Sequence, residues 1–181
     1  TLMFRTAENA PAYAVPVLLI AELLPGLIAA PYVGQLIDRR DAARILAIAS
    51  ALQAGVIALI AHYPMFTLGG AVLLSVLFTA SSAATFALIP VLASGLGTTL
   101  ARANSLLELA RSLGMLAGPV AGGVLVGWIG SRNALFADAL SFALLALVVL
   151  ASGLRRKPHR GDQEEQTLFA DYLPLLRNRR L

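Results

Sequence analysis

The sequence has no cysteine and few charged or aromatic residues. Among its 181 residues, 13% are charged, 7% are aromatic and none is Cys. Without Cys there is no disulfide framework, no thiol nucleophile and no Cys-based metal site. Soluble domains ordinarily carry about 25% charged residues, so the low charge argues against an ordinary soluble protein.

Apolar residues are abundant instead. They make up 58% of the chain, and the mean hydropathy is +0.78. A soluble fold of this size leaves much of its surface wet and cannot hide so much apolar area. We therefore predict an all-α membrane protein, a polytopic helical bundle with lipid as its solvent. The net charge of +4 comes with no motif that interleaves basic and aromatic residues, so we expect no nucleic-acid partner.

Several stretches are long and apolar enough to cross a membrane, which takes ~20 residues for ~30 Å of hydrocarbon. They cover residues 13–33, 45–61, 66–92, 106–129 and 133–154. Short turns separate them, as at His62-Tyr63-Pro64, and place successive spans antiparallel. We predict a bundle over residues 1–154, followed by a central loop over 155–181 with a short amphipathic helix at 167–176.

Basic residues are concentrated at one side of this bundle. They are Arg39, Arg40 and Arg44, then Arg102, and finally Arg155, Arg156, Lys157 and Arg160. Cytoplasmic loops carry an excess of Lys and Arg. We therefore predict that the loops at 34–44, 93–105 and 155–181 face the cytoplasm and that the protein lies in the cytoplasmic membrane.

The loop at 34–44 has an ordered set of small and charged residues. Gly34 is followed by Asp38 and Arg39, and basic charge returns at Arg44. An acid at a helix end can pair with Arg or cap the N-terminus of a neighbouring helix. The alternative interpretation is a plain basic loop that only sets topology.

A second pattern lies inside one span, at residues 114–123. Its members are Gly114, Gly118, Pro119, Gly122 and Gly123. Small residues four apart let helices approach closely in lipid, and a proline bends a helix. The alternative is the small-residue packing found in many membrane proteins.

Both patterns resemble the major facilitator superfamily of transporters. The loop matches the family order Gly-x-x-x-Asp-Arg, but Asp41 replaces a Gly and the two following basic positions are Ala. The second pattern resembles the Gly-x-x-x-Gly-Pro-x-x-Gly-Gly motif of exporters. Residues 22–26, 103–106, 138–142 and 176–181 resemble the branch with enterobactin exporters and macrolide-efflux-like proteins. The resemblance implies helices two to six of a twelve-helix transporter, followed by its central loop.

The resemblance also implies a function. It implies an ion-coupled secondary transporter that exports small molecules, such as drugs, macrolides or siderophores, by alternating access. The expected partners are a small-molecule substrate, membrane lipid and the C-terminal half of the same protein. Neither enzymatic activity nor a cofactor is expected. In the family, Asp38 and Arg39 would form part of a cytoplasmic gate.

Four ionisable residues fall at membrane depth, where such groups normally face a bundle interior or a wet cavity. For Glu22, we weigh a substrate or proton site against a structural hydrogen bond. Glu108 and Arg111 lie three apart, so they can pair as a structural or gating lock. For Asp138, we favour a structural role.

Two other functions fit parts of the sequence. Asp38, Asp41 and Arg44 faintly resemble the Asp-rich motif of CDP-alcohol phosphotransferases, in which carboxylates hold a divalent metal. That motif needs further Asp residues in the next helix, and residues 45–61 contain no acid. A membrane scaffold without transport activity is the third possibility, and a substrate-dependent change in intracellular accumulation would separate a carrier from a scaffold.

Overall fold

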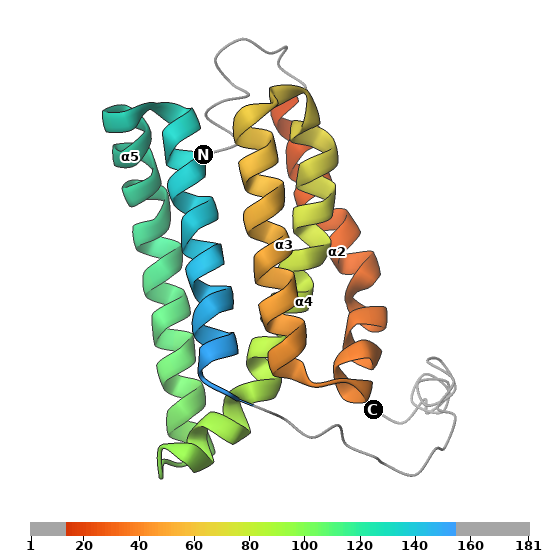
Figure 1. The fold of residues 1–181 in the computed structure, drawn as a ribbon, viewed down its shortest axis with the longest axis vertical. Helices are drawn as coiled ribbons and strands as arrows, with labels where there is room; N and C mark the ends of the chain where they lie inside the picture. Colours follow the sequence, from red (N-terminus) through yellow and green to blue (C-terminus); the bar gives the residue numbers. More distant parts are fainter. Residues whose placement is uncertain (1–13, 155–181) are drawn as a thin grey trace, which may run out of the picture.

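Helices form all the regular structure in residues 14–154, the part of the chain that the computed structural model describes. They are α2 (Ala14–Arg39), α3 (Ala42–His62), the 3-10 helix η1 (Pro64–Phe66), α4 (Thr67–Gly95) and α5 (Leu100–Ala151), shown in Figure 1. The all-α prediction is confirmed. The predicted amphipathic helix at 167–176 and the rest of the loop at 155–181 lie outside the described residues.

The helix α5 is two membrane-length helices joined at a sharp reversal. A straight helix of 52 residues would be about 78 Å long at 1.5 Å per residue, more than twice the ~30 Å hydrocarbon core. Gly130 interrupts it with φ 79° and ψ 160°, and the chain turns back on itself there (Figure 1). We refer below to the first half of α5 (100–129) and its second half (131–151).

The helix α2 continues further than the sequence predicted. Gly34, Asp38 and Arg39 belong to α2, which ends at Arg39, so this part of the predicted loop is helical. No helix breaker follows the apolar stretch, and Arg39 in the last turn interacts favourably with the helix dipole. The connection to α3 is therefore short and consists of Arg40 and Asp41.

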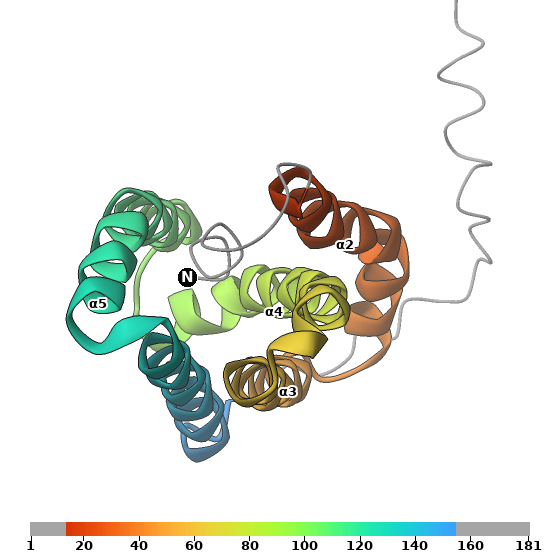
Figure 2. The ribbon, with the colours of Figure 1, turned by 90° about the horizontal axis from the view of Figure 1, so that it is seen from above.

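The helix α3 is the best buried element of the bundle. It packs against α4 on one side and α5 on the other, while α2 packs on α4 (Figure 2). Small side chains dominate the larger buried cluster, which includes Ala42, Ala43, Ala47, Ala49, Ala80 and Ala84. Because small residues let helix backbones approach closely, this composition explains why α3 and α4 lie so near each other.

Proline and glycine are accommodated in α2 by a neighbouring helix. Pro25 and Pro31 both lie inside α2. Next to the first of them, the backbone N–H of Gly26 donates a hydrogen bond to Oγ of Ser75 in α4, at 2.8 Å. Side chains of neighbouring helices commonly satisfy backbone groups near proline in a membrane. This bond fixes α2 against α4 within the apolar interior.

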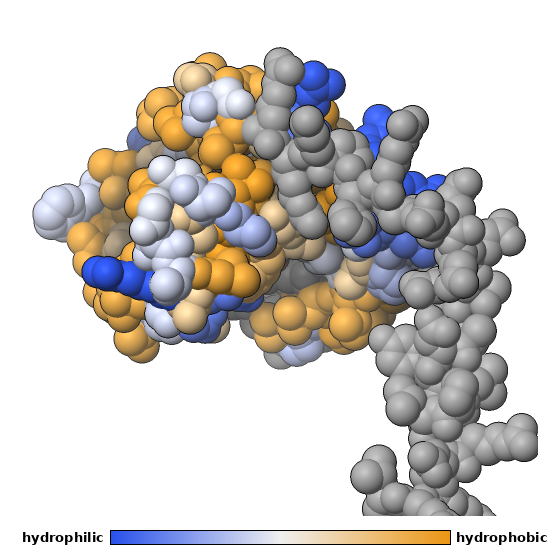
Figure 3. Space-filling view, turned by 90° about the horizontal axis from the view of Figure 1, so that it is seen from below, coloured by the Kyte–Doolittle hydropathy of each residue, from blue (hydrophilic) through white to orange (hydrophobic). Residues whose placement is uncertain are grey.

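The outer surface of the bundle is apolar. Leu27 and Leu116 are 72% and 75% exposed, and the single tryptophan, Trp128, is 84% exposed. In Figure 3, hydrophilic patches at the lower end of the bundle are surrounded by apolar side chains. The described residues include four helices long and apolar enough to cross a membrane. Lipid is the solvent that suits such a surface.

Candidate functional site

The connection between α2 and α3 is built around Asp41. Its carboxylate accepts a hydrogen bond from the backbone N–H of Ala43 at 3.1 Å and caps the first turn of α3. The same side chain lies 3.9 Å from Nε of Arg44 in an ion pair. Asp41 stands where the family motif has a glycine, and it acts as the N-cap of α3. Such a cap stabilises a helix by about 1 kcal/mol.

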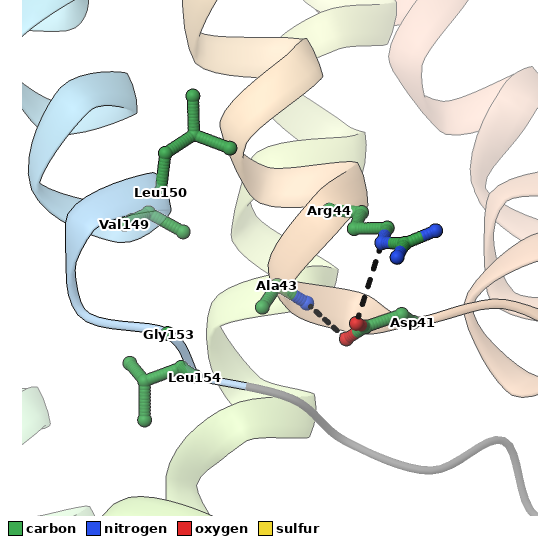
Figure 4. A pocket seen from close by; sticks show the side chains of 7 residues that line it. All are labelled: Asp41, Ala43, Arg44, Val149, Leu150, Gly153 and Leu154. Carbon is green, nitrogen blue, oxygen red and sulfur yellow. Dashed lines mark hydrogen bonds and ion pairs between the residues drawn. The ribbon is translucent and has the colours of Figure 1, made fainter.

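A shallow pocket of about 260 Å³ lies beside this cap (Figure 4). Asp41, Ala43 and Arg44 line it from the cap and first turn of α3, and Val149, Leu150, Gly153 and Leu154 line it from the end of α5 and the residues just after it. The start of α3 and the end of the last span therefore lie at the same end of the bundle. This arrangement agrees with the predicted topology, in which both connections face one side.

Asp38 and Arg39 lie on the exposed end of α2. Both side chains are exposed, whereas Asp41 is partly buried. A Cβ added at Gly34 would meet no atom within 4 Å. The residues that match the family motif are thus available to a partner, and Arg44 is held in a local ion pair with Asp41.

The glycine-rich motif lies in the first half of α5, which stands away from the other helices (Figure 2). No residue from 100 to 129 is buried. A Cβ added at Gly114, Gly118 or Gly123 would meet nothing within 4 Å, and Pro119 lies inside the helix between them. Within the described bundle, the small residues of this motif are therefore not used for close helix packing.

The predicted pair of Glu108 and Arg111 does not form an ion pair in the part of the chain that the structure describes. Both side chains are exposed, and the Arg111 guanidinium instead lies over the Phe86 ring, 5.7 Å from its centroid. Exposed pairs at this spacing gain only about 0.2–0.5 kcal/mol, so an aromatic contact competes easily. Glu22 lies in α2, and its side chain is outside the described part of the structure.

The structure assembles a mainly apolar pocket with three polar side chains, which the sequence analysis missed and which is called the polar pocket below. It has a volume of about 340 Å³, and its lining includes Leu23, Gln53, Ser75, Phe78, Asp138 and Phe142. These residues come from α2, α3, α4 and the second half of α5. The available signal was Gln53, a lone amide in an otherwise apolar span, together with Asp138.

Comparison with known families decides what kind of protein carries these features. The family model of the Major Facilitator Superfamily matches residues 9–181, nearly the whole chain. The chain belongs to the major facilitator superfamily. No curated protein and no solved structure matches it. The family resemblance seen in the loop and in the glycine motif is confirmed at the level of the superfamily.

Membership of the major facilitator superfamily fixes the general activity. The protein is a multi-pass membrane transporter for a small molecule, and the superfamily is normally non-enzymatic. The CDP-alcohol phosphotransferase alternative is therefore set aside. Within residues 14–154, no three His, Asp or Glu side chains are grouped so that they could hold a metal ion.

Proposed function

We propose that the full-length major facilitator protein exports small molecules, such as drugs, macrolides or siderophores, across the cytoplasmic membrane. Transport would be coupled to an ion and proceed by alternating access. The observation that supports export is the exposed motif at Gly114, Gly118, Pro119, Gly122 and Gly123 in the first half of α5. Its sequence resembles the motif of exporters in this superfamily.

The exposure of this helix suits alternating access. A secondary carrier of this kind rocks two halves against each other around a central site. A surface of small residues allows another helix to approach closely and to slide past it. The first half of α5 offers such a surface, since its glycines at 114, 118 and 123 face open space. The parts of the twelve-helix protein outside helices two to six, which are helix one and the C-terminal half, would supply the opposing surface.

Asp38 and Arg39 form the proposed cytoplasmic gate. Both project from the end of α2, and both are exposed. Exposed charges at the end of a rigid helix can pair with the other half of the protein in one conformation and separate in the next. Arg44 would support the gate indirectly, because its ion pair with Asp41 stabilises the start of α3.

Two further assignments complete the proposal. Glu22 would contribute to substrate or proton binding, since an acid in a span normally faces a cavity. Glu108 and Arg111 would act in gating by pairing in a conformation other than the one described, in which Arg111 lies over Phe86. Residues 77–86 of α4 contain no ionisable side chain, so none of them is proposed to couple transport to an ion.

The decisive experiment measures efflux by the full-length protein. Cells that express it should accumulate less of at least one compound in a panel of drugs, macrolides and siderophores than cells without it. The substitution Asp38→Asn should cut this efflux while membrane insertion stays normal. Arg40→Gln is the matched control, because Arg40 lies two residues after Asp38, in the connection to α3, at a position where the family motif sets no residue type.

Each outcome bears on a different part of the proposal. If no compound in the panel changes its accumulation, export fails and a scaffold role is favoured. If a verified substrate is exported equally well by wild type and Asp38→Asn, the gating role of Asp38 is wrong while export stands.

A further inference from the structure

The polar pocket defined above contains a buried acceptor without a partner. Gln53 is 1% exposed, and in the described part of the chain its Oε1 atom has no hydrogen-bond partner. Leaving such an atom unpaired in an apolar interior costs free energy, on the order of 1–3 kcal/mol. A group that donates a hydrogen bond at this position would recover that cost.

Two other oxygen-bearing side chains line the same pocket. Ser75 is 7% exposed, and its Oγ atom already accepts the hydrogen bond from the Gly26 N–H. The carboxylate of Asp138 lines the pocket from the second half of α5, and this side chain is accessible. Among the described helices, a ligand can therefore reach Asp138 without separating them. The oxygen atoms of Gln53 and Ser75 can accept hydrogen bonds, and the carboxylate of Asp138 supplies a negative charge. A positively charged hydrogen-bond donor would complement these groups.

The remaining lining is apolar and aromatic. Phe78 and Phe142 lie on the pocket wall with Leu23 and Leu74. Aromatic faces attract cations, and the leucines suit a hydrocarbon body. The volume of about 340 Å³ falls within the range of about 300–1,000 Å³ that is typical of small-molecule sites. It greatly exceeds the roughly 30 Å³ that one water molecule occupies in the liquid, so an organic group fits beside the charge.

We propose that this polar pocket binds an organic ammonium ion with a compact apolar body. The ammonium N–H groups donate to the carboxylate of Asp138 and to Oε1 of Gln53, while the hydrocarbon part packs against Phe78 and Phe142. Pairing with the ligand offsets the cost of an ionised carboxylate at membrane depth. All the residues of this site belong to one half of the transporter. The proposal of ammonium binding therefore stands or fails independently of export and of the gate at Asp38.

The test is equilibrium binding to the full-length protein in phosphatidylcholine nanodiscs, with empty nanodiscs as background. The probe is 1-naphthylmethylammonium, and its neutral counterpart is 1-naphthylmethanol. Wild type should bind the ammonium at least about tenfold more tightly than the alcohol, and Asp138→Asn should abolish this preference, since losing one partner of a desolvated charge pair is costly. Gln53→Leu should weaken ammonium binding several-fold, because only one hydrogen bond is lost.

The controls separate a specific site from membrane partitioning. Asp162→Asn removes a carboxylate from the sequence after the last span and should leave ammonium binding unchanged. Equal affinity of wild type for the ammonium and the alcohol overturns the proposal, as does full ammonium binding by Asp138→Asn. If Asp138→Asn does not insert, the two probes on wild type and the Gln53→Leu variant still decide the question.

Discussion

Nη2 of Arg132 lies 3.0 Å from Nδ1 of His62, a contact between residues 70 positions apart in sequence. It joins the end of α3 to the turn within α5, so these two connections occupy the same end of the bundle. The Arg132 guanidinium also lies over the Phe136 ring, 5.9 Å from its centroid. Because guanidinium offers only donors, Nδ1 of His62 is the acceptor in this contact.

The contact between Arg132 and His62 should stabilise this end of the bundle. His62→Phe removes the acceptor of the hydrogen bond and should lower the free energy of unfolding by about 1 kcal/mol, measured by thermal unfolding in detergent. His159→Phe changes the other histidine of the sequence and should leave the melting temperature unchanged. Equal melting temperatures for the two variants would contradict a stabilising contact.

Gly130 should not tolerate a side chain. Its φ of 79° with ψ of 160° belongs to a region that is essentially restricted to glycine. We expect Gly130→Ala to destabilise the protein by about 1–3 kcal/mol, measured by thermal unfolding in detergent. Gly127→Ala is the matched control, since Gly127 is helical and a Cβ there meets nothing within 4 Å. Equal melting temperatures for the two variants would contradict this interpretation.

Gly26 should be required for the contact between α2 and α4. A Cβ at this position would lie 2.6 Å from Thr79 Oγ1 and 2.7 Å from Ser75 Oγ. We expect Gly26→Ala to cost about 1–3 kcal/mol through overpacking. Gly34→Ala, in the same helix but facing open space, should be neutral or stabilising by up to about 1 kcal/mol. Thermal unfolding compares the two, and a stable Gly26→Ala protein would argue against close packing here.

Removal of the cap at Asp41 should weaken the start of α3. Asp41→Ala removes the hydrogen bond to the Ala43 N–H and should lower the free energy of unfolding by about 1 kcal/mol. Asp38→Ala removes an exposed carboxylate from the neighbouring helix end and should change stability by less than about 0.5 kcal/mol. Hydrogen exchange at the first turn of α3 would locate the effect, and equal protection in both variants would exclude capping.

The sequence was sufficient to predict the helices, because a long apolar run indicates a membrane helix whether its side chains contact lipid or other helices. Spans at 45–61 and 66–92 correspond closely to α3 and α4. The turn at 130–133 could also be predicted, since Gly130, Ser131 and Arg132 interrupt an apolar run too long for one crossing. The end of α2 could not, because Gly34 is compatible with either a loop or a helix.

Side-chain partners were harder to predict than helices. Asp41 looked like a departure from the family loop, yet its position directly before α3 makes it a cap. Arg111 was expected to pair with Glu108 on its own helix, but Phe86 from α4 takes its place. Gln53 was missed because it lines a pocket together with Asp138, which is distant from it in sequence. All three depend on contacts or boundaries that spacing within one helix does not determine.

The reversal at Gly130 has a consequence for the chain as a whole. A polypeptide that crosses a bilayer changes sides once per crossing, so the parity of the crossings decides on which face each later residue lies. A continuous α5 would remove one reversal and send Leu154 to the face opposite Asp41, whereas the two line the same pocket. One residue with an unusual backbone geometry thus determines on which face the second half of α5 ends.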